Sequence, residues 1–167
     1  MALRNVLTFP HPHLRLVAKP IEQVTPEIQL LLDDMMETMY AEQGIGLAAS
    51  QIDVQLRAVV MDLSDERNEP LYIVNPEIIE KEGSQDVKAG CLSIPGIYES
   101  VPYPAKVRVQ FLDRYGKEIE MVVEKMLAAC FQHEIDHLNG KLFTDYLSPL
   151  KRERIEKKLI KMSKVRL

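Results

Sequence analysis

Two histidines and a glutamate in the C-terminal third of the chain have the spacing of a catalytic metal site. His133 and His137 are four residues apart in the segment QHEIDH, so a helix would place both imidazoles on one face, within reach of one metal ion. Glu134 follows the first histidine, and its carboxylate could take a proton from a water molecule on that metal. The chain has only four histidines, which favours a metal-binding pair over two unrelated helical histidines.

The third ligand of this site has two candidates, because a catalytic metal usually takes three protein ligands and leaves one position open. Cys91 lies beside Gly90 in a predicted loop whose backbone could approach an ion, and a thiolate binds borderline or soft divalent metals strongly. Glu156 lies 19 residues beyond His137, a spacing typical of a small metalloprotease. It stands among lysines and arginines, as on a solvated helix face. The residue types favour Cys91, with the metalloprotease as the alternative.

A third segment, GIGLAASQ at Gly44–Gln51, combines small residues with an amide side chain. Two glycines would let a substrate backbone approach closely, and Gln51 could donate a hydrogen bond to a developing oxyanion. Taken alone, the segment is equally typical of a helix end followed by a bend, with Gly44 just past the terminus.

Length and composition indicate one globular domain, residues 1–167. The chain is 46% hydrophobic and 28% charged, which excludes disordered and fibrous classes. Its longest unbroken apolar run is Met126–Phe131, far short of the roughly 20 residues of a membrane span. The proline-containing N-terminus does not resemble a signal peptide. Two cysteines without an export signal predict a reducing, cytoplasmic setting.

The elements that must position these residues predict an α+β fold. A helix should begin at Pro26, after the capping Thr25, and end before Gly44. Short strands are predicted at Arg57–Asp62, Leu71–Asn75, Ile78–Lys81, Ala105–Leu112 and Glu118–Glu124. Helices are predicted over Lys125–Leu138 and over 148–167. We therefore expect small antiparallel or mixed sheets packed around a central metal-binding helix, with an N-terminal and a C-terminal helix.

The three motifs, in this order, resemble the peptide deformylase family. Its segments Gly-x-Gly-x-Ala-Ala-x-Gln, Glu-Gly-Cys-Leu-Ser and Gln-His-Glu-x-Asp-His correspond to Gly44–Gln51, Ala89–Ser93 and Gln132–His137, and the Phe9–Arg15 stretch is also similar. The resemblance implies removal of the N-formyl group from the initiator methionine of nascent polypeptides, with release of formate. It also implies one divalent ion per chain, Fe²⁺ first and Zn²⁺, Ni²⁺ or Co²⁺ otherwise, on Cys91, His133 and His137.

The resemblance also assigns roles around the metal. Glu134 would carry the proton from water to the leaving amine, while the Leu92 backbone N–H and Gln51 stabilise the oxyanion. The residues expected to bind substrate are Ile45, Gly46, Gly90, Met126, Ala129 and Cys130. Cys130 is expected to be buried and not to bind the metal. Gln132 and Asp136 are candidates for orienting the metal ligands. Asp136 is equally a candidate for a surface ion pair.

Two positions depart from the family pattern. Ala89 stands where the family usually has Glu, and Lys125 stands where Gly is common. Neither residue is a predicted ligand or base, so we expect the chemistry to survive with an altered pocket.

The C-terminal segment carries a charge opposite to that of the rest of the chain. Residues 150–167 contain eight Lys or Arg and two Glu, whereas the remainder contains 13 basic and 23 acidic residues. This division predicts contact with a polyanion. Together with a nascent-chain substrate, it indicates ribosomal RNA rather than DNA or membrane. Ile155 and Leu159 equally predict a helix that packs on the body, and both interpretations can hold on different faces.

Replacing each candidate third ligand distinguishes the two metal sites. Cys91→Ala should lose the metal, since two imidazoles alone hold an ion weakly, and Glu156→Ala should keep it. Metal analysis of anaerobically prepared protein measures both. Loss in the Glu156 variant alone would support the metalloprotease.

A further alternative is a protein without enzymatic activity, in which the metal site serves structure and the basic C-terminal segment serves as a binding module. Release of formate from a formyl-methionyl peptide would distinguish a deformylase from such a protein.

Overall fold

The computed structural model describes residues 2–165 and has an α+β fold, as predicted. The helices are α1 (Pro26–Ala41), α2 (Lys125–Leu138) and α3 (Pro149–Val165). The strands are β1 (Gly46–Ala48), β2 (Ala58–Met61), β3 (Leu71–Glu82), β4 (Gln85–Cys91), β5 (Ile94–Tyr103), β6 (Lys106–Leu112) and β7 (Glu118–Glu124). Among residues 2–165, no helix combines the length and apolarity needed to cross a membrane.

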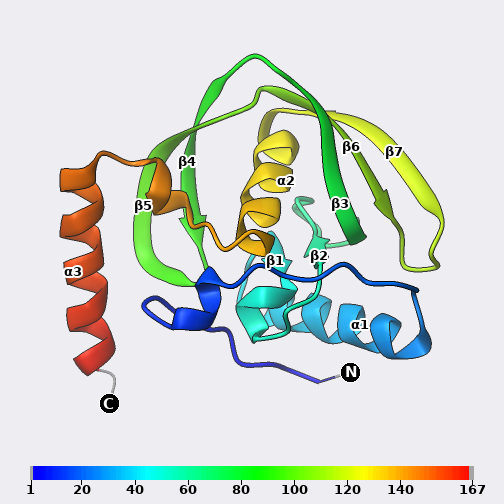
Figure 1. Cartoon of the computed structure of the whole chain (residues 1–167), viewed down its shortest axis with the longest axis horizontal. Coiled ribbons are helices and arrows are strands. Elements are labelled where there is room, and N and C mark those ends of the chain that lie inside the picture. The colour runs from blue at the N-terminus through cyan, green and yellow to red at the C-terminus, as the bar shows by residue number, and fades with distance from the viewer. Residues whose placement is uncertain (1, 166–167) are drawn as a thin grey trace.

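The strands form two antiparallel units on either side of α2. One is a five-stranded sheet in the order β1-β2-β3-β6-β7, and the other is the β4–β5 hairpin. In Figure 1, α2 runs between β4–β5 on one side and β3, β6 and β7 on the other, while α1 lies below. Phe131 of α2 packs on the sheet with Val109 and Val123, and Ala129 packs on the hairpin. The helix α2 is therefore central and apolar on two faces.

The N-terminal segment fixes the C-terminal end of α2. Ala18 donates its backbone N–H to the Leu138 carbonyl at 2.8 Å, and Arg57 donates to the same carbonyl at 3.2 Å. These bonds satisfy a carbonyl that a helix end leaves without an intrahelical partner. Gly140 then turns with φ +76°, and a Cβ at that position would collide with the backbone carbonyl of Arg15. The turn after α2 therefore requires glycine.

The strands of the structure differ from the predicted ones. Leu71–Asn75 and Ile78–Lys81 belong to one strand, β3, in which the register shifts between Val74 and Glu77. Asn75 has φ +51° at this shift, and its side chain bonds the backbone N–H and carbonyl of Ile21, both at 2.8 Å. β1, β4 and β5 were not predicted as strands, since β1 has only three residues and the polar and apolar residues of β5 do not alternate cleanly. Cys91 consequently ends a strand and does not lie in a loop.

The end of α1 also differs in detail. The left-handed residue after the helix is Gln43, with φ +60°, and not Gly44. Gly44 closes the helix end through its N–H, which donates to the Met39 carbonyl at 2.9 Å. Glycine also leaves room for the Leu92 side chain, because a Cβ at position 44 would lie 2.9 Å from Leu92 Cδ1.

Lys125 begins α2 with a backbone conformation that glycine adopts more readily. Its φ is +56°, in the left-handed region, and its N–H donates to the Ala105 carbonyl at 3.1 Å. This geometry explains why glycine suits the position, and a lysine there carries about 1 kcal/mol or more of backbone strain.

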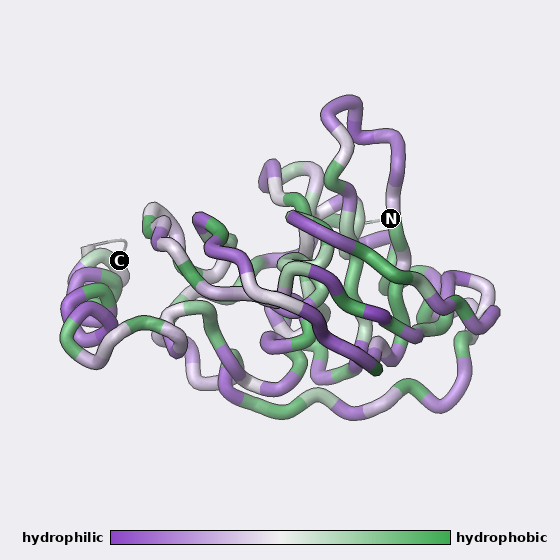
Figure 2. The backbone as a smooth tube through the Cα atoms, turned by 90° about the horizontal axis from the view of Figure 1, so that it is seen from above, coloured by the Kyte–Doolittle hydropathy of each residue, from purple (hydrophilic) through white to green (hydrophobic). Residues whose placement is uncertain are grey.

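α3 packs beside the hairpin through a narrow apolar stripe. Ile155 and Leu159 are buried in one cluster with Ile97, Val101 and Phe143, as the amphipathic pattern predicted. Lys151 adds an ion pair to Glu99 of β5 at 3.1 Å. Seen from above, α3 lies at one end of the molecule, and its turns alternate between hydrophobic and hydrophilic colours (Figure 2).

Candidate active site

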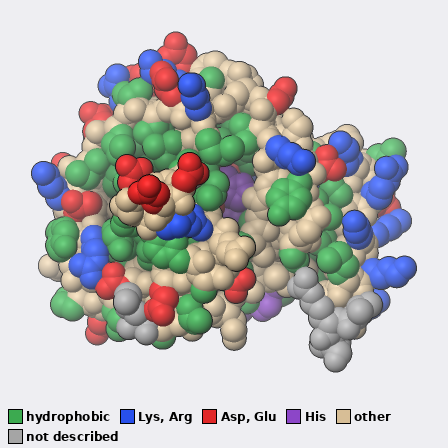
Figure 3. Space-filling model, turned by 180° about the vertical axis from the view of Figure 1, so that it is seen from behind, with side chains coloured by type: hydrophobic (Ala, Val, Ile, Leu, Met, Phe, Trp, Pro, Cys, Tyr) green, Lys and Arg blue, Asp and Glu red, His purple; other side chains and the backbone are tan. Residues whose placement is uncertain are grey.

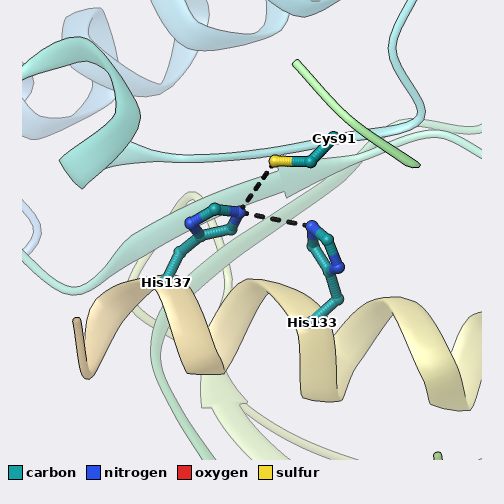
Figure 4. Close-up of side chains that lie close together, drawn as sticks. All are labelled: Cys91, His133 and His137. Atoms are coloured by element: carbon teal, nitrogen blue, oxygen red, sulfur yellow. Dashed lines mark hydrogen bonds between the residues drawn. The ribbon is translucent and has the colours of Figure 1, made fainter. Parts of the chain in front are cut away.

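Three side chains from two elements form a cluster that could hold a metal ion. The Cys91 Sγ lies 3.2 Å from His137 Nε2, which lies 3.2 Å from His133 Nε2. All three atoms are within 4.8 Å of one another. Figure 4 shows both imidazoles rising from α2 toward the thiol at the end of β4. The helical spacing of the histidines and the strand end at Cys91 thus converge on one point.

The donor atoms fit one divalent ion in both spacing and chemistry. Ligand atoms that share a tetrahedral ion at roughly 2.0–2.3 Å are separated by roughly 3.3–3.6 Å, close to the two distances observed. A thiolate with two imidazoles suits several borderline first-row metals. Glu156 is not part of the cluster: it lies on α3, where its Oε1 is 3.5 Å from Arg152 Nε, and the β4–β5 hairpin stands between α3 and α2 (Figure 1).

Burial keeps the imidazoles in the form that binds cations. Desolvation lowers the pKa of His133 to about 4, and it lowers the pKa of His137 well below its ordinary value. Both rings are therefore neutral at pH 7, with lone pairs available. Burial, followed by the nearby Glu134 carboxylate, raises the pKa of the Cys91 thiol to about 12. A coordinated cation reverses that effect and deprotonates the thiol.

Glu134 lies beside the cluster with one oxygen unused. Its Oε1 is 3.8 Å from His133 Nε2. Its Oε2 is buried and has no hydrogen-bond partner among the described residues. Burial and the charge of Asp136 raise the pKa of Glu134 to about 8. A Cβ at Gly46 would approach Glu134 Oε1 to 3.1 Å, so the glycine makes room for this carboxylate. The geometry suits a group that accepts and returns a proton.

Gln51 is oriented by hydrogen bonds at both ends of its amide. Its Oε1 accepts from the Ala48 N–H at 2.9 Å, and its Nε2 donates to Ser93 Oγ at 3.0 Å and lies 3.6 Å from Cys91 Sγ. Ser93 is fully buried and was not among the predicted site residues. Leu92, which precedes it, lies in the turn between β4 and β5. Gln51 and Leu92, the two residues predicted to stabilise the oxyanion, therefore lie next to the cluster of Cys91, His133 and His137.

The N-terminal segment holds these two positions in place. Leu7 donates its N–H to the Gln51 carbonyl at 2.7 Å, and Phe9 donates to the Ser93 carbonyl at 2.8 Å. The two bonds connect the short helix Ala49–Ile52 to the β4–β5 turn. The Phe9–Arg15 stretch is similar to the family pattern, and the hydrogen bond from Phe9 to Ser93 gives this stretch a structural role beside the site.

A cavity of about 500 Å³ opens beside the cluster. The residues predicted to bind substrate all line it: Ile45, Gly46, Gly90, Met126, Ala129 and Cys130. Its wall also includes Val87, Tyr98 and Tyr103, which the sequence did not indicate. In the space-filling view from behind, a histidine is visible at the bottom of a hollow (Figure 3). The cavity size suits a small apolar side chain with part of a peptide backbone.

Gln132 and Asp136 bond to each other and not directly to the imidazoles. Gln132 Nε2 donates to Asp136 Oδ1 at 2.9 Å, and Tyr146 donates its hydroxyl to Asp136 Oδ2 at 2.6 Å. Tyr103 does contact a predicted ligand, because its Oη lies 3.2 Å from His133 Nδ1. No local pattern marked Tyr103, which lies 30 residues before His133.

Comparison with known proteins gives one consistent result. The family model described as polypeptide deformylase matches residues 3–153. The chain is 57% identical to a peptide deformylase of Azotobacter vinelandii over 96% of both chains, and 56% identical to peptide deformylase 1 of Pseudomonas syringae pv. tomato over 99% of both. A crystal structure of a Legionella pneumophila peptide deformylase superposes with a TM-score of 0.93 at 48% identity, covering 99% of this chain and 98% of that one.

A solved structure with a bound ligand agrees as well. The peptide deformylase of Ehrlichia chaffeensis in complex with actinonin has a TM-score of 0.93 and 40% identity, over 97% of this chain and 98% of that chain.

The raised pKa of Glu134 predicts a pH-dependent stability in protein freed of metal by chelation. A carboxyl group that binds its proton more tightly when folded stabilises the fold at low pH. That stability is lost as the pH rises from its ordinary pKa of 4.5 through the folded value of about 8. Glu134→Gln should therefore gain in free energy of unfolding over the unaltered protein between about pH 5 and pH 8.

Urea unfolding at a series of pH values measures this difference. The histidines and Cys91 are present in both proteins, so their titrations largely cancel. Parallel stability curves for the two proteins would contradict the burial of Glu134.

Proposed function

Since this chain belongs to the peptide deformylase family, it removes the formyl group from nascent peptides, and we propose that Cys91, His133 and His137 hold the metal ion this hydrolysis requires. The observation that supports the assignment is the cluster itself, three donors within 4.8 Å of one another beside a buried carboxylate. The donor set suits Fe²⁺, Zn²⁺, Ni²⁺ and Co²⁺. We propose Fe²⁺ as the resident ion because the family resemblance favours it.

Glu134 is the proton carrier in this proposal. A divalent ion held by Cys91, His133 and His137 would lower the pKa of a water and polarise the formyl carbonyl. Glu134 accepts the proton of the attacking water through an oxygen that has no other partner among the described residues and then delivers it to the leaving amine nitrogen. Its burial favours both steps, because a carboxyl group whose pKa lies near neutrality can hold and release a proton at working pH.

Gln51 and Leu92 stabilise the oxyanion of the tetrahedral intermediate. The Gln51 amide is already oriented by Ala48 and Ser93, so little reorganisation accompanies the reaction. The Leu92 backbone N–H is placed in the same region by the tight turn between Cys91 and Ile94. Donors fixed before the charge develops contribute more than mobile ones.

The substrate binds as an additional strand next to β1. β1 is an edge strand of the five-stranded sheet, so Ile45 and Gly46 can offer main-chain hydrogen bonds to an extended peptide. The methionine side chain enters the cavity lined by Met126, Ala129 and Cys130. A formyl group carries hydrogen where an ordinary acyl group carries a side chain, so a confined site admits it and excludes internal peptide bonds.

The basic face of α3 is the proposed contact with the ribosome. Arg154, Lys158 and Lys161 are exposed and recur at i, i+4 and i+7, on a different face from buried Ile155 and Leu159. Figure 3 shows blue side chains along this end of the molecule. Nascent chains emerge from ribosomes in the cytoplasm. Ribosomal RNA is the polyanion nearest to them, and its phosphates would attract the basic face of α3. We therefore place the reaction in the cytoplasm.

Glu134→Gln should abolish turnover without loss of metal. The amide keeps the shape of the carboxylate but cannot accept the proton, so formate release from a formyl-Met-Ala-Ser peptide should fall on the order of 10²- to 10⁴-fold. Metal content should stay at the level of the unaltered protein, because Glu134 is not a ligand. Glu156→Gln, a matched change on α3, should leave both quantities unchanged. Turnover of the Fe²⁺ protein no better than that of the Glu134 variant would refute the proposal.

Charge reversal on α3 tests the proposed ribosome contact without removing core residues. Lys158→Glu combined with Lys161→Glu should weaken co-sedimentation with ribosomes at low salt, because two attractive phosphate contacts become repulsive. The same reversal at exposed Lys19 and Lys117, far from α3 in sequence, is the control. Equal co-sedimentation of both double variants would show that α3 has only a structural role.

A further inference from the structure

The described residues around His133 include a partner that the proposed reaction does not use. Tyr103, the last residue of β5, is buried with 3% of its surface exposed. Its hydroxyl oxygen lies 3.2 Å from His133 Nδ1, the ring nitrogen that faces away from the cluster. Tyr103 comes from the hairpin and His133 from α2, so this contact joins the two elements that supply the metal ligands.

The direction of this hydrogen bond follows from the ligand role of the ring. His133 presents Nε2 to the cluster, so the proton of the neutral imidazole resides on Nδ1. Nδ1–H therefore donates, and the Tyr103 oxygen accepts. Burial and the charge of Asp136 raise the pKa of the Tyr103 phenol well above its ordinary value. The acceptor is a neutral hydroxyl at any working pH.

The position of Tyr103 is itself fixed by packing. Its ring lies against that of Tyr146, with centroids 5.9 Å apart and planes tilted by 59°. Tyr146 in turn donates to Asp136, which also accepts from Gln132. Gln132 and Asp136 are therefore connected to His133 only indirectly. Asp136 contacts Tyr146, Tyr146 packs on Tyr103, and Tyr103 contacts His133.

A second contact restrains the same imidazole from its face. The Phe143 ring stacks on His133, with centroids 6.2 Å apart and planes 28° apart. Phe143 limits the tilt of the ring, and Tyr103 limits its rotation about the bond to Cβ. His137 lacks a comparable restraint, since its Nδ1 is buried with no hydrogen-bond partner among the described residues.

We propose that Tyr103 is a positioning residue, which orients His133 toward the metal by accepting the hydrogen bond from Nδ1–H. This inference rests on the proposed metal role of Cys91, His133 and His137. Partners of this kind orient a ligating imidazole and raise its basicity. A phenol does so without adding a negative charge, in a chain that has Ala89 in place of the carboxylate usual in the family.

Tyr103→Phe and Tyr146→Phe make a matched pair for the test. Each removes one hydroxyl from the same aromatic pair, but only the Tyr103 hydroxyl touches His133. In the Co²⁺-loaded protein, Tyr103→Phe should weaken Co²⁺ affinity about 10- to 100-fold in competition with a chelator, and it should shift the visible absorption bands of the ion. Tyr146→Phe should change affinity less than about threefold and leave the bands in place.

Two results would overturn the inference. One is Co²⁺ affinity and absorption in Tyr103→Phe that match those of the unaltered protein. The other is an equal loss in both variants, which would indicate a general packing effect. If Tyr103→Phe does not fold, the unaltered Zn²⁺ protein labelled with ¹⁵N-histidine remains informative. The His133 Nδ1–H should give a slowly exchanging NMR signal, and its absence would also refute the inference.

Failure of the proposed function would look different. If the cluster does not bind metal, the unaltered protein will not take up one Co²⁺ per chain. The Cys91→Ala variant will then show the same Co²⁺ uptake as the unaltered protein. If only the role of Tyr103 is wrong, the unaltered protein will bind Co²⁺ normally and the Tyr103 variant will bind equally well.

Discussion

Burial of the polar turn Gln132–His137 inside an otherwise apolar helix is the constraint on which the rest of the structure depends. A charge or polar group removed from water costs several kcal/mol unless a partner replaces the water. Gln132 and Tyr146 supply partners for Asp136, and Tyr103 supplies one for His133. The Nε2 atoms of His133 and His137 lie beside the Cys91 thiol, where a bound cation would compensate for the burial of both imidazoles.

The surrounding elements are arranged so that this turn has room and does not move. Gly46 leaves space for the Glu134 carboxylate, and Gly140 allows the chain to turn tightly against Arg15 at the end of α2. The N-terminal segment bonds to Gln51 and Ser93 on one side and to Leu138 on the other. Catalysis by fixed donors requires such support, because each oriented group must hold its place without help from water.

α3 combines two tasks on separate faces. Ile155 and Leu159 complete the cluster beneath the hairpin, so the helix stabilises the strands that carry Cys91 and Tyr103. Lys158 and Lys161 face solvent. The charge division noted in the chain therefore reflects one helix with a buried stripe and a basic face. A simple acidic net charge of −4 conceals this arrangement.

The sequence by itself determined the features that depend on neighbouring residues. The spacing of His133 and His137, the amphipathic stripe of α3 and the order of the three motifs are local, since helical geometry relates residues i and i+4 directly. The α+β class and the central helix followed from these patterns. β4 and β5 did not, because β5 alternates poorly and the pairing of the two strands is decided by packing.

Only the tertiary structure decided how distant residues meet. It brought Cys91 and not Glu156 to the histidines, placed Ser93 behind Gln51, and set Tyr103 against His133. It also joined Asp136 to Gln132 and Tyr146, and joined neither Gln132 nor Asp136 to an imidazole. These contacts span 30 or more positions of the chain in most cases. Their geometry comes from the packing of hairpin, sheet and helix around one buried polar turn, which no local pattern records.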